Sequence, residues 1–411
     1  MKTDATRRKI ALFGNFGAGN IGNDCTLEAM LHNLRRYVPN AEVMCICTNP
    51  EYIASNYKIF GFPIREMPWK GPPRRNSGAT RWLRGIFVGI PSELRRWMKA
   101  ISTLKSTDML IMTGTGMLGD FGISALGLHY DILRWSILAK LCRCKVLFVS
   151  VGAGPIQSAL SRRFVKAALS IADYRSYRDS FSKEYMDSIG FDTSKDIVYP
   201  DLVFSAPAAR IPGGHNRNGQ KAVIGVGLMT YYSKRADPLN DEAIYREYIT
   251  KVAAFVIQLL ERNYTVRLLI GDTAYDGRAQ QDLREILEGK GLNFEDGRII
   301  EEPSSSFDEL LSQLAASDVV VASRFHNVLL ALMVTKLVVA LSYHEKDDAL
   351  MAGAGMAEFC QDIEHIDVDK LIAQVATLER NATNLKPQLE QKTETFRRDL
   401  DEQYDRIFNT V

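Results

Sequence analysis

The segment SRFHNVLLALMVTKLVVALSYHEK, from Ser323 to Lys346, places residues suited to an anion and a proton at the start of an expected helix. Arg324 can hold a carboxylate or phosphate through a two-pronged hydrogen bond, and His326 can exchange a proton near neutral pH. Both follow DVVVA, an apolar run typical of a buried strand. Lys346, after the next strand, adds a second positive charge. This pattern fits a small anionic substrate that undergoes acid-base chemistry.

A histidine at a helix start can also have a purely structural role, bonded to the backbone. We favour the functional interpretation of His326 because Arg324 stands at the same strand end, where parallel sheets bind their ligands. None of the six histidines has a zinc-binding spacing, so we expect no metal site. Glu301 and Glu309 have a spacing seen in some nucleotide-sugar glycosyltransferases, but two glutamates at this distance are common by chance.

Three glycine-rich loops each follow an apolar strand in the first half of the chain. They are GNFGAGNIGND (14–24), TGTGMLGD (113–120) and VGAGPI (151–156). Glycine lets the backbone approach a ligand closely, and the N–H groups at a helix start favour an anion. One such loop is explained equally well as a tight turn, but ordinary connections rarely need three. The loops therefore predict the floor of a site for a polar ligand.

Short apolar strands alternate with amphipathic helices along most of the chain, which predicts parallel sheets covered by helices. The expected strands lie at residues 9–16, 42–48, 108–114, 145–152 and 197–204, then at 222–228, 265–272, 297–302, 318–323 and 336–343. A stretch rich in Gly, Pro and Asn separates the two series.

The expected fold class is therefore α/β, with two Rossmann-like doubly wound domains facing a central cleft. We place the first domain at residues 1–207, a linker at 208–220 and the second domain at 221–367. A charged helical tail, 368–411, packs across the interface or lies on the surface. The site should lie between the domains, where the ends of both sets of strands meet.

Composition excludes several classes of protein. Hydrophobic residues make up 46% of the 411 residues and charged residues 24%, as in ordinary globular proteins. A net charge of +2 predicts no nucleic-acid partner. The six cysteines form no disulfide framework or zinc knuckle. The longest apolar run is interrupted by Lys336 and is too short to span a bilayer, and nothing at the start of the chain directs export.

Together these motifs resemble those of the polysaccharide pyruvyl transferase family, over roughly residues 9–356. The most specific match is the segment from Ser323 to Lys346, which is similar to the family's S-R-x-H followed by a small apolar helix and a strand ending in S-Y-x-x-K. The three glycine-rich loops also match. So do SYRDSFS, with Arg178 and Asp179, and YPDLVF, with Asp201.

The resemblance implies a GT-B-type fold and the transfer of a pyruvyl group from phosphoenolpyruvate to a sugar, with release of phosphate. His326 would handle the proton, and Arg324, Ser323 and Lys346 would bind the donor. The acceptor side of the cleft would be lined by N-terminal loop residues, namely Asn15, Gly17, Asn20 and Gly116. No cofactor is expected, because phosphoenolpyruvate is itself the donor substrate.

The chain departs from the family pattern in two places. Gly22, Asn23 and Asp24 stand where the family often has G-D-E, and Thr115 interrupts what is often a run of three glycines. Both departures lie in the N-terminal half, so they bear on the acceptor more than on the donor.

Residues 69–99 carry eight basic residues against one acid, with three of the chain's four tryptophans interleaved. Basic residues and tryptophan together are typical of peripheral binding to an anionic membrane surface. We therefore expect a lipid-linked saccharide acceptor and a cytoplasmic location, peripheral on the inner face of the cell membrane. The alternative is a solvated helical hairpin whose tryptophans are packed.

Two other functions stay open from the sequence. One is a GT-B glycosyltransferase that uses a nucleotide sugar, which would bind UDP or GDP but not phosphoenolpyruvate. The other is a catalytically silent family member that binds glycan or lipid, whose acceptor binding would survive His326→Ala without turnover in either form.

Overall fold

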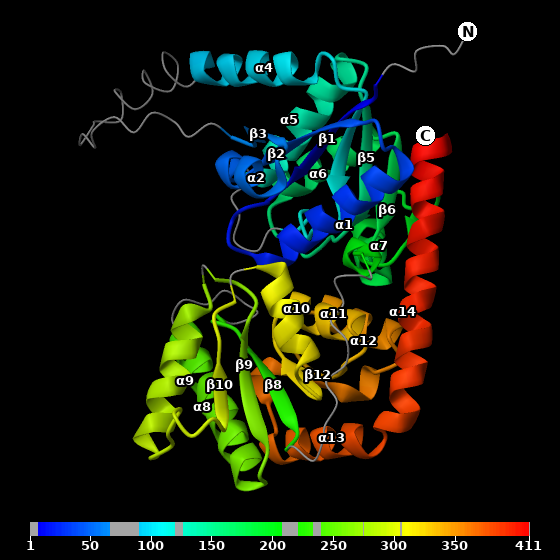
Figure 1. Cartoon of the computed structure of the whole chain (residues 1–411). Helices are drawn as coiled ribbons and strands as arrows, with labels where there is room; N and C mark the ends of the chain where they lie inside the picture. The colour runs from blue at the N-terminus through cyan, green and yellow to red at the C-terminus, as the bar shows by residue number, and fades with distance from the viewer. Residues whose placement is uncertain are drawn as a thin grey trace, which may run out of the picture.

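The structure is a computed structural model that describes residues 7–65, 90–119, 126–207, 221–232, 240–273, 275–304 and 306–410. Within these ranges the chain forms two α/β domains, one above the other in Figure 1. The expected linker, 208–220, and residues 69–89 of the basic stretch lie outside the described residues.

The first domain is built on a seven-stranded parallel sheet with the order β3-β2-β1-β4-β5-β6-β7. Its strands are β1 (Lys9–Gly14), β2 (Glu42–Cys47), β3 (Phe60–Pro63), β4 (Met109–Thr113), β5 (Lys145–Val151), β6 (Tyr174–Tyr177) and β7 (Ile197–Val198). Its helices include α1 (Ile21–Tyr37), α2 (Pro50–Tyr57), α4 (Ile90–Leu104), α5 (Leu128–Leu141), α6 (Ala159–Ser170) and α7 (Ser180–Ser188).

The second domain has a six-stranded parallel sheet with the order β10-β9-β8-β11-β12-β13. Its strands are β8 (Val223–Leu228), β9 (Thr265–Ile270), β10 (Ile299–Glu301), β11 (Val319–Ala322), β12 (Leu337–Ser342) and β13 (Cys360–Asp362). The helices between them are α8 (Asp241–Glu261), α9 (Gly277–Gly289), α10 (Phe307–Ala315), α11 (Phe325–Met333) and α12 (Glu345–Gly353).

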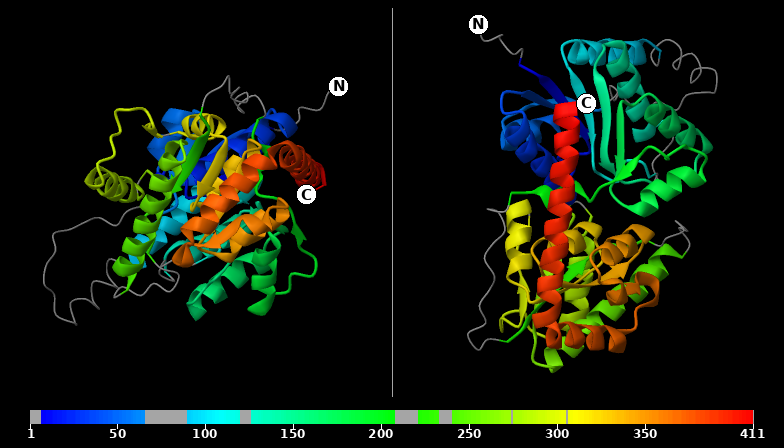
Figure 2. Two further views of the ribbon diagram at one scale, coloured as in Figure 1. Left: turned by 90° about the horizontal axis from the view of Figure 1, so that it is seen from below. Right: turned by 90° about the vertical axis from the view of Figure 1, so that its right-hand side faces the viewer.

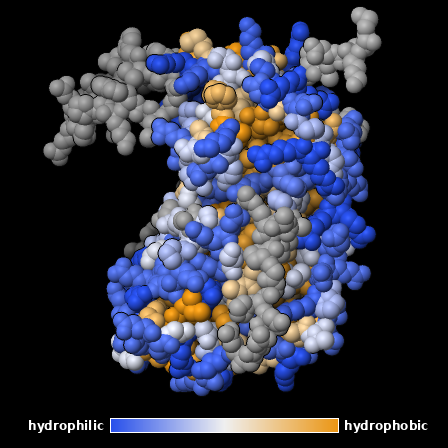
Figure 3. All heavy atoms as spheres, viewed as in Figure 1, coloured by the Kyte–Doolittle hydropathy of each residue, from blue (hydrophilic) through white to orange (hydrophobic). Residues whose placement is uncertain are grey.

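Both sheets reverse their winding direction next to their first strand, which is the doubly wound order. Strands β4, β11 and β12 are buried along their whole length, as expected of parallel strands covered by helices on both faces. The predicted fold class, two Rossmann-like domains of GT-B type, is confirmed. Most of the face seen in Figure 3 is hydrophilic, with hydrophobic residues in separate patches.

One expected strand is mostly wrong. Residues 197–204 were expected to continue as a strand, but β7 has only two residues and is followed by a short 3-10 helix, Leu202–Ser205. Pro200 has no N–H to donate to a neighbouring strand, and the side chain of Asp201 accepts a hydrogen bond from the backbone N–H of Val203, which caps the helix.

The C-terminal helices tie the two domains together. Helix α13 (Val368–Arg380) packs on the second domain, and the long helix α14 (Ala382–Asp405) runs back along both domains to the first (Figures 1 and 2). Near its end, Gln403 bonds with Ser150 and Ser176 at the edge of β5 and β6, and Tyr404 is fully buried. The relative position of the domains therefore depends on α14 as well as on their direct contacts.

Helix α4 is the described end of the basic stretch. Trp97 packs against α5, where its Nε1 donates a hydrogen bond of 3.4 Å to the Tyr130 hydroxyl. By contrast Leu94, Met98 and Ile101, which recur at helical spacing, are 61%, 56% and 37% exposed. The outer side of α4 thus carries exposed apolar residues beside exposed Arg95 and Lys99, and the one tryptophan that the structure describes here faces inward.

Candidate active site

The candidate site lies where the loops after β1, β4 and β5 face the loops after β11 and β12. Direct contacts also join the loop after β1 to the loop after β9. Asn20, the N-cap of α1, donates from Nδ2 to the Asp272 carboxylate at 3.2 Å, and the backbone N–H of Thr273 donates to the carbonyl of Gly19. The carboxyl ends of the two sheets therefore meet, as the sequence predicted for a doubly wound pair.

His326 is the second residue of α11 and lies against the first turn of α1. A Cβ atom added to Gly22 would come within 1.9 Å of the His326 Cγ, so only glycine leaves room for this ring. The Nε2 atom of His326 is enclosed and has no hydrogen-bond partner among the described residues. The ring is thus fixed by packing between the domains, with its Nε2 atom enclosed.

Three positive side chains surround His326. Burial lowers the pKa of His326 well below 6.5, and the charges of Arg178, Lys346 and Arg324 lower it further. The imidazole is therefore neutral at neutral pH. A bound anion would be attracted by the same three charges, and its own charge would raise the pKa of His326 again.

Arg324 is held in place by a buried carboxylate. As the N-cap residue of α11, it donates from Nε and Nη2 to Asp276, at 2.8 and 2.5 Å. Asp276 is fully buried and also accepts from the backbone N–H of Thr230. This pair uses two of the three guanidinium nitrogens, Nε and Nη2. Asp276 could not be predicted as a partner of Arg324, because the two residues lie 48 positions apart in the chain.

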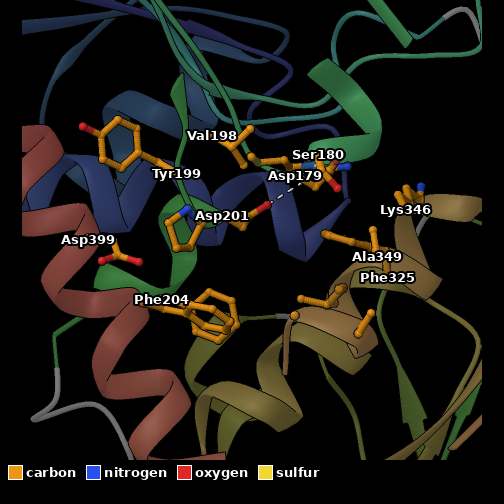
Figure 4. Close-up of a pocket in the computed structure, with 16 residues that line it drawn as sticks. Asp179, Ser180, Val198, Tyr199, Asp201, Phe204, Phe325, Lys346, Ala349 and Asp399 are labelled. Atoms are coloured by element: carbon orange, nitrogen blue, oxygen red, sulfur yellow. Dashed lines mark hydrogen bonds and ion pairs between the residues drawn. The ribbon is translucent and has the colours of Figure 1, made fainter. Parts of the chain in front are cut away.

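Arg178, which follows β6, lies over the second and third glycine-rich loops. A Cβ on Gly152 would come within 2.7 Å of its Nε, and one on Gly116 within 3.7 Å of its Nη2. Its Nη1 forms an ion pair with Asp201 at 3.2 Å, which is drawn in Figure 4. The guanidinium also lies 4.3 Å from the ring centre of Phe325 in the second domain. These loops therefore make room for an arginine that reaches across the domain boundary.

Lys346 approaches from α12. Its Nζ lies 4.6 Å from the ring centre of Tyr343 and 5.4 Å from that of Phe325. His344 caps the same helix by accepting from the backbone N–H of Lys346, and burial together with Lys346 lowers the pKa of His344 to about 4. His344 is therefore also neutral and adds no charge to the site.

A cavity of about 390 Å³ opens beside these cations. Arg178 is among its lining residues. Lys346 and Phe325 lie at one end of the cavity, and Phe204 and Asp399 lie toward α14 (Figure 4). Phe204 packs against Phe396, with ring centres 4.9 Å apart. The lining also includes Asp179 and Asp201, so the cavity combines two cations, three carboxyl groups and a cluster of aromatic rings.

The structure does not bring every predicted residue to this place. Ser323 is buried, and its hydroxyl lies 3.1 Å from the Tyr248 hydroxyl inside the second domain. Gly17 has a φ of 71°, which favours glycine, and its N–H donates to Asp24. The Asn15 carbonyl accepts from Asn23. These residues of the first loop serve its own hydrogen bonding, and Asn20 joins the two domains.

The two spaced glutamates have separate structural partners. Glu301 forms an ion pair with Arg284, and Glu309 completes the capping box of α10 with Ser306. In the part of the chain that the structure describes, no three His, Cys, Asp or Glu side chains gather as a metal site would require. Among the described helices, none is long and apolar enough to cross a membrane.

The close fit of Gly22 against His326 can be tested with a matched pair of substitutions. Alanine normally suits a helix better than glycine does, yet we expect Gly22→Ala to destabilise the protein by about 1–3 kcal/mol through overpacking. Gly289→Ala in α9, where nothing lies within 4 Å of the added Cβ, should be neutral or stabilise by up to about 1 kcal/mol. Urea unfolding of both variants measures the difference, and equal effects would contradict the contact.

Comparison with known proteins agrees with the fold described above. The curated amylovoran biosynthesis protein AmsJ of Erwinia amylovora is 22% identical over 412 residues, which cover 95% of this chain and 96% of AmsJ. The UDP-GlcNAc 2-epimerase of Methanocaldococcus jannaschii has a TM-score of 0.58 at 11% identity, covering 90% of this chain and 92% of its own. Anabaena HepE, solved with UDP and glucose, has a TM-score of 0.55 at 12% identity, covering 97% and 99%.

The two solved structures share only the fold with this chain. The sequence itself is matched by the family model "Polysaccharide pyruvyl transferase" over residues 20–345, a span that begins within the first glycine-rich loop and includes Arg178, Arg324 and His326. On this match, the chain belongs to the polysaccharide pyruvyl transferase family.

Proposed function

We propose that the protein is a pyruvyl transferase that moves the pyruvyl group of phosphoenolpyruvate to two hydroxyls of a sugar, releasing phosphate. The observation that carries the proposal is the group of three cations, Arg178, Arg324 and Lys346, around a neutral histidine. Phosphoenolpyruvate carries a carboxylate and a phosphate, so several cations are needed to hold it. Among the described residues, His326 is the titratable group whose pKa is lowered by the charges of all three cations.

The reaction balances with these groups. The donor's CH₂ carbon gains a proton, and one sugar hydroxyl adds to the neighbouring carbon as it loses its own proton. The C–O bond to phosphate then breaks, and a second hydroxyl takes its place, so that its proton leaves with the phosphate. His326 exchanges the protons, and the cations stabilise the charge on the departing phosphate. No cofactor enters this balance.

The family name and AmsJ's role in amylovoran biosynthesis support a saccharide acceptor. We place the reaction in the assembly of a cell-surface polysaccharide, on a lipid-linked saccharide at the cytoplasmic face of the membrane. The exposed apolar side of α4 supports this location, because Leu94, Met98 and Ile101 alternate there with exposed Arg95 and Lys99.

Phosphate release from phosphoenolpyruvate tests the reaction directly. The wild type should release phosphate only when an acceptor from a panel of lipid-linked and nucleotide-linked sugars is present. His326→Asn should lower kcat at least a hundredfold, because it removes the proton-handling group. Lys346→Ala should raise the KM for phosphoenolpyruvate at least tenfold, because it removes one cation.

Lys392→Ala, an exposed lysine on α14, is the matched control and should leave both constants unchanged. Binding of UDP or GDP, with no acceptor able to trigger phosphate release, would instead support a nucleotide-sugar glycosyltransferase. Acceptor binding without turnover, equal in wild type and His326→Asn, would support a silent binding protein.

Donor binding should also raise the proton affinity of His326. Its pKa is depressed in the free protein, so the imidazole is neutral at pH 7, and the donor's negative charges counteract the three cations. We expect net proton uptake when phosphoenolpyruvate binds, measured by calorimetry in buffers of different ionisation enthalpy. The difference between wild type and His326→Asn isolates this residue, because any proton lost by the donor is common to both. Equal uptake in the two proteins would show that His326 does not take the proton.

Membrane binding through α4 predicts that the full-length chain sediments with vesicles containing phosphatidylglycerol. Leu94→Ser together with Met98→Ser should weaken this binding at least tenfold, since two apolar side chains no longer enter the lipid. Leu160→Ser, an exposed leucine on α6, serves as the control and should have little effect. Binding that is unchanged by the double substitution would rule out α4 as the contact.

A further inference from the structure

A second cavity, of about 430 Å³, lies between the domains along α1, away from the residues that line the cation cavity. One wall comes from α1 and α2 in the first domain, and the other from Ser306 and Phe307 at the start of α10 in the second. We call it the α1–α10 groove. Its lining includes Ile21, Asp24, Glu28, Tyr52, Asn56 and Tyr57.

The groove wall carries two tyrosine–carboxylate pairs. The Tyr57 hydroxyl donates to Glu28 Oε1 at 3.2 Å, and the Tyr52 hydroxyl bonds with Asp24. The two tyrosine rings meet edge to face, 6.3 Å between centres. Burial, followed by the nearby carboxylates, raises the pKa of Tyr52 to about 12 and that of Tyr57 further, so both hydroxyls stay protonated.

This chemistry does not suit the phosphoenolpyruvate donor. The lining holds two carboxyl groups, Asp24 and Glu28, and two exposed cations, Arg35 and Lys58, so the groove lacks the excess of positive charge that a molecule with two or three negative charges needs. It suits a neutral molecule rich in hydroxyls. Carboxylates accept hydrogen bonds from hydroxyls, the tyrosine and asparagine side chains can both donate and accept, and the tyrosine rings offer apolar faces to the C–H groups of a sugar.

The groove begins at the first turn of α1. Its lining includes Ile21, which is next to Gly22, and Gly22 lies against the His326 ring. Asp24 and Glu28 are turned about 200° and 240° around the helix axis from Gly22, so they line the side of α1 that faces away from His326. A saccharide in the groove would therefore reach the histidine around the N-terminal end of α1, past Ile21.

We propose that the α1–α10 groove is the binding site for the neutral saccharide acceptor, with Glu28, Tyr52 and Tyr57 contacting its hydroxyls. This inference rests on the proposed function, because it takes the sugar to be the second substrate. It gives the two substrates separate sites, the anionic donor beside Arg178 and Lys346 and the sugar along α1. It also assigns acceptor recognition to residues on α1 and α2 rather than to the first glycine-rich loop.

Saccharide binding to the full-length protein can be measured by saturation-transfer NMR. The probes are the methyl glycosides of glucose, galactose, mannose and N-acetylglucosamine, together with lactose and cellobiose, each with and without phosphoenolpyruvate. We expect at least one probe to bind the wild type. The double variant Glu28→Gln with Tyr57→Phe should weaken its binding at least tenfold.

A second variant distinguishes the loss of a binding contact from a loss of folding. Asn56 is exposed at the rim, so Asn56→Trp should block the groove while leaving the buried pairs intact, and it should weaken the probe at least tenfold. Glu51→Gln on the same helix is exposed and outside the lining, and it is the matched control. Thermal unfolding should show that all variants stay folded at the assay temperature.

The outcomes separate this inference from the proposed function. Probe binding that survives both groove variants, or no probe binding to the wild type, would overturn the groove. Acceptor-dependent phosphate release with an acceptor KM unchanged in both variants would overturn the groove while upholding pyruvyl transfer. Probe binding lost in both variants, with no phosphate release from any acceptor, would uphold the saccharide site and overturn the transferase.

Discussion

The meeting of three positive side chains around one neutral histidine is the constraint on which the rest of the site depends. Like charges repel, so each cation needs its own local stabilisation when no anion is bound. Arg178 is paired with Asp201 and Arg324 with Asp276, and both carboxylates are buried. Lys346 instead lies over aromatic rings. These partners hold the charges in position before a substrate arrives, which is the preorganisation that electrostatic catalysis requires.

The cations come from both domains, so the site exists only when the domains are together. Arg178 belongs to the first domain, but the aromatic ring beneath it, Phe325, belongs to the second. Gly22 and Asn20 make the matching contacts on α1. Helix α14 runs along both domains and inserts Gln403 and Tyr404 into the first. Helix α14 therefore helps to keep the two domains, and with them the two halves of the site, together.

The parts of this arrangement that are local in sequence could be predicted. Strand periodicity and glycine at strand ends indicated two doubly wound sheets, and Arg324 and His326 stood out because they share one strand end. Contacts between residues that are far apart in the sequence could not be predicted. Asp276 contacts Arg324 although the two residues are 48 positions apart in the chain. The need for glycine at position 22 becomes clear only from the structure, where the His326 ring fills the space that a side chain would take. Asp201 was noticed through a family motif, but it was predicted to lie within a strand. It lies after β7, because Pro200 has no N–H to continue the strand pairing.

The two hollows between the domains differ in the side chains that line them. The first has Arg178 and Lys346 together with Asp179, Asp201 and Asp399, and the second has Asp24 and Glu28 together with Arg35 and Lys58. Both linings are therefore of mixed charge. The three cations that lower the pKa of His326 act on its ring, so an anion is attracted toward the histidine rather than by either hollow as a whole. A neutral sugar depends instead on hydrogen bonds and aromatic faces, which the second hollow offers through Tyr52 and Tyr57.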